Sequence, residues 1–236
     1  SWGTVLGMHM VKRQPQLLHA YIGVGQVVNS MESERGIYQR LLEYATKAEN
    51  EQALIAKLES IAPYPNPDCP EKSFVEHCGF VRKELSRLAG ETLMHHVKWD
   101  DAIRMLTFEK TVSPHLTLTD ISNAIFGDDL AILREPYQFT KEFMGTNLPQ
   151  ELGSSFDVPI FFFTGRHDYQ TLITLSDQWF SEIDAPNKSL IHFEESSHFV
   201  VNEEPGRVLN TLVNEVLPFA QPTSSNPRVQ TGVSNA

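Results

Sequence analysis

The sequence is poor in cysteine, in basic residues and in long apolar runs. Its only two cysteines, Cys69 and Cys78, lie nine residues apart in a region of helical pattern, where lone thiols are most often unpaired. A disulfide or a metal pair between them stays open. No second Cys/His pair at metal-ligand spacing completes a zinc site, so we predict neither a metal nor an organic cofactor.

These scarcities exclude several classes of function. No stretch of about 18 apolar residues occurs, so no membrane-spanning helix is predicted. Asp and Glu number 30 against 19 Lys and Arg, a formal net charge of −11, and an acidic surface repels nucleic acid. Neither a signal peptide nor an initiator methionine opens the chain, so we expect the natural N-terminus to lie upstream of Ser1.

The apolar pattern of the 236 residues predicts a helical segment set between two α/β segments. Residues 2–14 have a helical pattern that ends before Pro15, and residues 19–29 (HAYIGVGQVVN) have the β-branched and aromatic character of a strand. Residues 31–150 are rich in charged amphipathic stretches with Leu, Ile and Ala at helical spacing. We therefore predict an inserted helical cap over 31–150.

Strand character returns after residue 150. Residues 158–164 (VPIFFFT) are a continuous apolar run, as a parallel strand covered on both faces requires. A helix over 171–183, a strand over 188–193 (KSLIHF) and a helix over 205–219 follow. The predicted class is therefore α/β, with a parallel sheet. Its core is built from 1–30 and 151–219, and a disordered tail is expected over 220–236.

Three short segments carry residues suited to catalysis. Ser1-Trp2-Gly3 precedes a helix and matches the second half of the Gly-x-Ser-x-Gly nucleophile elbow. Asp168 follows one predicted strand and His198 follows the next, where open α/β sheets place their sites. Taken singly each signal is weak, because Asp168 could cap a turn and His198 could be structural. The order Ser, Asp, His is the one that α/β-hydrolases require.

These segments resemble the capped α/β-hydrolases of the prolyl aminopeptidase (proline iminopeptidase) type. SWGTVLGMHMVKRQPQLLHAYIGVGQ is similar to the family's elbow, helix and next strand. VPIFFFTGRHDYQT is similar to its acid-bearing turn, and APNKSLIHFEESSHFVVNEEP to its histidine loop. The family's sheet begins with strands before the serine, so the chain is expected to correspond to the C-terminal part of that sheet.

The resemblance implies Ser1 as nucleophile, Asp168 as acid and His198 as base, with the Trp2 amide as one oxyanion donor. In aminopeptidase-type members, cap carboxylates receive the substrate amine, so the resemblance makes Glu32 and Glu34 candidate substrate-binding residues. The alternative for both is a carboxylate favoured at a helix start. His167, next to Asp168, is a rival base that we expect to diverge from it.

The predicted function is a serine hydrolase that cleaves a small ester or amide, including an N-terminal aminoacyl bond of a peptide. One alternative is a non-catalytic or inactive hydrolase-like module. Another takes Ser1 as an N-terminal nucleophile whose own amine is the base, in a fold of stacked antiparallel sheets. On its own this chain is expected to be nearly inactive, because only one oxyanion donor is present.

Overall fold

The computed structural model describes most of the chain. The described residues are 1–89, 94, 95, 117, 119 and 143–220. The predicted tail and most of the predicted cap beyond residue 89 therefore lie outside the described residues.

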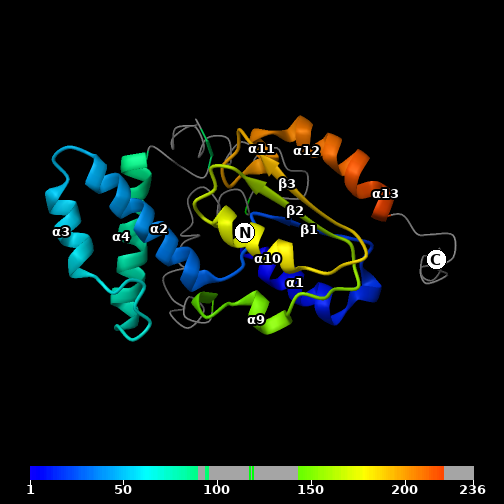
Figure 1. The fold of residues 1–236 in the computed structure, drawn as a ribbon, viewed down its shortest axis with the longest axis horizontal. Coiled ribbons are helices and arrows are strands. Elements are labelled where there is room, and N and C mark those ends of the chain that lie inside the picture. The colour runs from blue at the N-terminus through cyan, green and yellow to red at the C-terminus, as the bar shows by residue number, and fades with distance from the viewer. Residues whose placement is uncertain (90–93, 96–116, 118, 120–142, 221–236) are drawn as a thin grey trace.

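The centre of the fold is a parallel sheet of three strands in the order β1-β2-β3 (Figure 1). The strands are β1 (Tyr21–Val24), β2 (Ile160–Gly165) and β3 (Lys188–Phe193). In the register, β1 places Ile22 opposite Phe161, and β2 places Phe163 opposite Ile191. This confirms the predicted α/β class with a parallel sheet. The strands predicted over 158–164 and 188–193 are parallel neighbours in it.

Helices cover both faces of the sheet, and β2 is therefore buried on both sides. Alternate side chains of a strand point to opposite faces, so Phe162 packs with Met8 and Trp179, whereas Phe163 packs with Val208. The first group involves α1 (Gly3–Arg13) and α10 (Ile173–Glu182). The opposite face carries the C-terminal helices, namely α11 (Val200–Glu203), α12 (Pro205–Thr211), the π-helical turn η2 (Leu212–Val216) and α13 (Leu217–Ala220).

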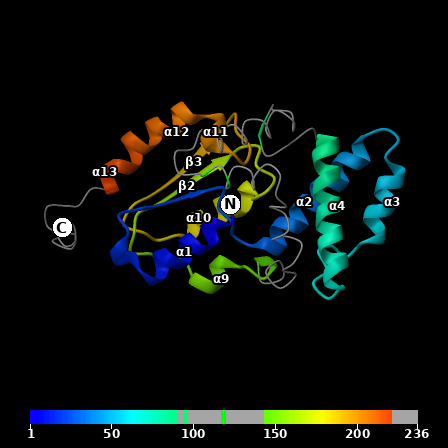
Figure 2. The same cartoon turned by 180° about the vertical axis from the view of Figure 1, so that it is seen from behind.

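Three further helices project from one end of the sheet, as Figures 1 and 2 show. They are α2 (Ser30–Lys47), α3 (Gln52–Ser60) and α4 (Glu71–Ala89), and they share an apolar core of their own. The chain leaves the sheet and returns to it at one place, because Ser30 N donates to Thr146 O and Leu148 N donates to Val28 O. The short helix α9 (Leu148–Leu152) begins there. The described part of 31–150 is thus an insertion dominated by helices, and the division into domains stays a prediction.

Two expectations differ in extent from the structure. The strand expected over 19–29 ends at Val24, because Gly25 takes a φ of +56° that breaks the extended backbone. The single helix expected over 205–219 is interrupted by the π-helical turn η2. In the described part of the chain no helix has the length and hydropathy needed to cross a bilayer. Cys69 and Cys78 are both free thiols.

Candidate active site

The acid and the histidine meet at the carboxyl end of the sheet. Asp168 lies three residues after β2 and His198 five residues after β3, at the edge where neighbouring parallel strands end together. His198 Nδ1 lies 2.9 Å from Asp168 Oδ2. Both residues are buried, with 2% of Asp168 and 8% of His198 exposed. A buried, hydrogen-bonded pair of this kind orients an imidazole and fixes its tautomer.

Asp168 is held by its own turn. Its Oδ1 accepts from the backbone amides of Gln170 (2.7 Å) and Thr171 (3.0 Å), and its Oδ2 accepts from Thr171 Oγ1 (2.6 Å). Burial opposes ionisation, but the hydrogen bond and charge of His198 and the bonds from Thr171 outweigh it and lower the pKa of Asp168. The turn-capping role considered for Asp168 is therefore present alongside its contact with His198.

The histidine loop and the acid turn are joined directly through the backbone. His167 N donates to Ser196 O (3.0 Å), and Ser197 Oγ donates to His167 O (2.9 Å). The close approach depends on Gly165, where an added Cβ would lie 1.9 Å from Ser197 O. Glycine at the end of β2 thus lets the turn of Asp168 and the loop of His198 pack against each other.

A carboxylate beneath the histidine loop supports its backbone. Glu203 Oε2 accepts from Ser197 N (2.8 Å), next to His198, and its other oxygen accepts from His95 N. Burial raises the pKa of Glu203 to about 7, the Ser197 and His95 amides oppose that rise, and the charges of Glu204 and Asp168 add to it.

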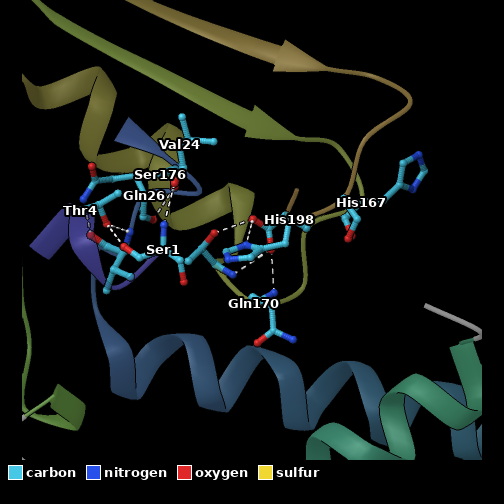
Figure 3. A network of polar contacts seen from close by, with 12 residues as sticks. Ser1, Thr4, Val24, Gln26, His167, Gln170, Ser176 and His198 are labelled. Carbon is cyan, nitrogen blue, oxygen red and sulfur yellow. Dashed lines mark hydrogen bonds and ion pairs between the residues drawn. The ribbon is translucent and has the colours of Figure 1, made fainter. Parts of the chain in front are cut away.

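Ser1 is tied to the turn that follows β1, as Figure 3 shows. Its nitrogen donates to Val24 O (2.7 Å), and its carbonyl accepts from Thr4 N (2.8 Å). Thr4 Oγ1 in turn accepts from Val27 N (3.0 Å). These bonds attach the start of α1 to the end of β1.

Gly25, the residue after Val24, separates this attachment from the imidazole. A Cβ at Gly25 would lie 2.9 Å from His198 Cε1, and Gly25 N donates to Phe163 O (3.1 Å). Ser1 N therefore bonds the last residue of β1, and the His198 ring lies next to Gly25, the residue that follows it. Among the described contacts there is no hydrogen bond between Ser1 Oγ and the imidazole, and the nucleophilic role of Ser1 stays a prediction.

Replacing Gly25 by alanine is expected to damage both stability and activity. The φ of +56° and the Cβ contact with His198 should lower the free energy of unfolding by about 1–3 kcal/mol. The displaced imidazole should also lower kcat for an ester substrate by about a hundredfold, because catalytic geometry tolerates little error. Gly79→Ala is the matched control, since nothing lies within 4 Å of its Cβ. Equal stability of both variants in urea would contradict the expectation.

The other predicted site residues lie in different surroundings. The Trp2 ring stacks on Phe143 with centroids 4.7 Å apart, and its amide role in an oxyanion hole stays a prediction. Glu32 is exposed and pairs with Arg35 on the same helix. Glu34 is buried, and it contacts Arg82 and the Tyr64 hydroxyl. Binding of a substrate by either carboxylate stays a prediction.

Neither His167, the rival base, nor the strand residue His192 forms a hydrogen bond with Asp168 in the described part of the structure. The His167 ring stacks on His95, with centroids 3.5 Å apart and planes 5° from parallel. His192 Nε2 lies 2.8 Å from Oδ1 of Asp177, a residue of α10. The parallel sheet is also unlike the stacked antiparallel sheets expected of an N-terminal nucleophile enzyme.

Sequence reasoning missed three residues of this region, namely Thr171, Gly25 and Arg82. Thr171 follows Asp168 by three residues, a spacing typical of capping contacts, and could have been found. Gly25 lies in the glycine-containing segment that was predicted as a strand over 19–29, and glycine in such a segment is a local signal for a break. Arg82 carried none, because its neighbours in space are 48 and 88 residues away in the chain.

Comparison with known proteins finds one curated relative and no family model that matches the chain. The probable aminopeptidase YbaC of Bacillus subtilis (strain 168) is 28% identical over 213 residues, which cover 90% of this chain and 62% of the relative. This similarity to a probable aminopeptidase agrees with the aminopeptidase-type resemblance expected from the elbow, the acid turn and the histidine loop.

Two solved structures with lower identity are also similar. One is MGS-M2, an α/β hydrolase from a Medee basin deep-sea metagenome library, with 12% identity, a TM-score of 0.49, and coverage of 96% of this chain and 65% of that one. The other is the proline iminopeptidase of Mycobacterium smegmatis, with 14% identity, a TM-score of 0.47, and coverage of 93% and 63%. The chain spans less than two thirds of the length of each of these three proteins.

Proposed function

We propose that the protein is a serine hydrolase that cleaves a small ester or amide. The observation that carries this is the buried His198–Asp168 pair at the carboxyl end of the sheet, beside the turn that holds Ser1. The name of the Bacillus relative, a probable aminopeptidase, supports keeping an N-terminal aminoacyl bond among the candidate substrates.

In the proposed reaction Ser1 Oγ attacks the carbonyl carbon, and His198 Nε2 takes the hydroxyl proton. The tetrahedral oxyanion receives a hydrogen bond from the Trp2 amide at the start of α1. His198 then gives the proton to the leaving group as the carbonyl–leaving-group bond breaks. Water, deprotonated by the same imidazole, cleaves the acyl-enzyme and restores the serine. Asp168 stays ionised throughout and stabilises the imidazolium.

A fluorophosphonate probe tests this proposal, because it forms a covalent bond only with an activated serine. We expect the protein, as its gene encodes it, to be labelled at Ser1, with the adduct located by peptide mass spectrometry. Ser1→Ala should abolish labelling. Ser181→Ala, at an exposed serine whose hydroxyl donates to Gln178 O, should leave labelling unchanged. Labelling that persists in Ser1→Ala would refute the assignment of the nucleophile.

A further inference from the structure

Ser1 and Arg82 line the same cavity, which has a volume of about 250 Å³. Trp2, Val27, Phe143 and Met144 supply its apolar walls. Among the described residues that line it, Arg82 bears the only charged side chain. A cavity of this size suits a small ligand. A cation in the same cavity as the proposed nucleophile indicates which charge such a ligand carries.

Arg82 lines the cavity and does not use all of its donors in bonds to the described residues. Its Nε donates to Glu34 Oε1 at 3.2 Å, one terminal nitrogen donates to the same oxygen, and the other donates to Gln170 Oε1. A guanidinium has five N–H groups, so two remain after these three bonds to residues that the structure describes. The side chain is 31% exposed, which leaves room for a ligand to approach.

Glu34, by contrast, is already satisfied. Its Oε1 accepts from Arg82, its Oε2 accepts from the Tyr64 hydroxyl, and only 1% of the side chain is exposed. It faces a smaller adjoining cavity of about 20 Å³ that Arg82 also lines. Glu34 is covered and already paired, so it is poorly placed to receive a substrate amine, whereas the partly exposed guanidinium of Arg82 is the member of the pair that a ligand can reach.

We propose that Arg82 determines substrate specificity by binding a carboxylate, so that the substrate is a small ester or amide that carries a carboxylate away from the scissile bond. Guanidinium groups bind carboxylates with paired, charge-assisted hydrogen bonds. Glu34 and Gln170 hold the guanidinium in place, and Gln170 also connects it to the turn of Asp168. The inference rests on the proposed function, because it takes Ser1 as the attacking group.

A pair of matched esters tests the inference. Mono-p-nitrophenyl glutarate and p-nitrophenyl valerate have acyl chains of equal length that end in a carboxylate and a methyl group. We expect the protein to favour the glutarate ester in kcat/KM. Glu34→Gln removes the neighbouring negative charge and keeps the shape of the side chain. It should raise the glutarate-to-valerate ratio by about tenfold, the effect of one charge close to the ligand.

The double variant Glu34→Gln/Arg82→Met should lower the same ratio by about tenfold or more relative to the unmodified protein. Both charges are removed together, because Arg82→Met alone would leave the buried Glu34 carboxylate without its partner and destabilise the fold. Arg87→Met is the control on the same helix, since Arg87 is exposed and pairs with Glu51 and Glu84. This control should leave the ratio unchanged.

Binding of glutarate separates failure of this inference from failure of the proposed function. By titration calorimetry in the Ser1→Ala background, glutarate should bind, and the double variant should lose about tenfold in affinity. Equal glutarate affinity with and without Arg82, or ratios that do not change among the variants, would overturn the inference even if hydrolysis depends on Ser1. Selective loss of aminoacyl-arylamide hydrolysis in Glu34→Gln, with an unchanged ester ratio, would overturn it in favour of an amine site. Hydrolysis that persists in Ser1→Ala would instead refute only the proposed function.

Discussion

Replacing His198 by alanine is expected to reduce kcat for a p-nitrophenyl ester by about 10⁶-fold, the loss typical of removing the base or nucleophile of a triad. The variant lacks the group that takes the proton from Ser1 Oγ. Asp168 keeps its bonds from Gln170 N, Thr171 N and Thr171 Oγ1, so its charge stays paired with hydrogen-bond donors and the fold should persist. Stopped-assay hydrolysis and circular dichroism together measure the two expectations.

Two comparisons make the His198 result specific. Imidazole added to the His198→Ala variant should restore part of the activity, because the missing ring leaves a space beside Asp168. His167→Gln should keep nearly full activity, since its ring stacks on His95 and lies apart from the His198–Asp168 bond. A large loss in His167→Gln together with a small loss in His198→Ala would show that His167 is the base.

Asp168→Asn is expected to lower kcat by about 10⁴-fold with little change in KM. The amide keeps the shape of the side chain, but its NH₂ group cannot accept the hydrogen bond that His198 Nδ1–H donates. The imidazole then adopts the wrong tautomer, and its protonated form loses an anionic partner. Asp177→Asn is the control, because Asp177 pairs with His192 away from Asp168. A loss of less than tenfold in Asp168→Asn would argue against the triad.

The same substitution should change how stability depends on pH. The folded-state pKa of Asp168 is lowered, so its ionised form stabilises the folded protein at pH values above the ordinary value of 3.8. That contribution is lost as the pH falls below 3.8 toward the folded-state pKa. The free energy of unfolding in urea, measured from pH 7 to pH 3, should therefore fall less steeply for Asp168→Asn than for the unmodified protein. Parallel curves would contradict the lowered pKa.

The local sequence was informative wherever one segment determines its own structure. The apolar run of β2 is buried on both faces, as predicted, because five of its six residues have side chains that need covering and helices lie on each side. The placement of Asp168 and His198 after two successive strands was also readable, since parallel strands end at a common edge. These patterns depend on near neighbours in the chain.

Other features depend on segments far apart in the chain. The left-handed turn at Gly25 is specified by contacts with β2 and His198, and neither is close in sequence. The helix over 205–219 has a continuous helical pattern, and only the structure places the π-helical turn within it. A pattern of apolar residues sets the type of an element more firmly than its detailed geometry.

By itself, the sequence determined the α/β class, the order of strands and helices, and the candidate residues Ser1, Asp168 and His198, because periodicity and motif order are properties of the chain alone. Only the tertiary structure decided that Asp168 and His198 form a hydrogen bond, and that Arg82 neutralises Glu34 and shares a cavity with Ser1. These contacts arise when α2 and α4 pack together and the carboxyl ends of two strands meet. No local pattern encodes the distance between such segments.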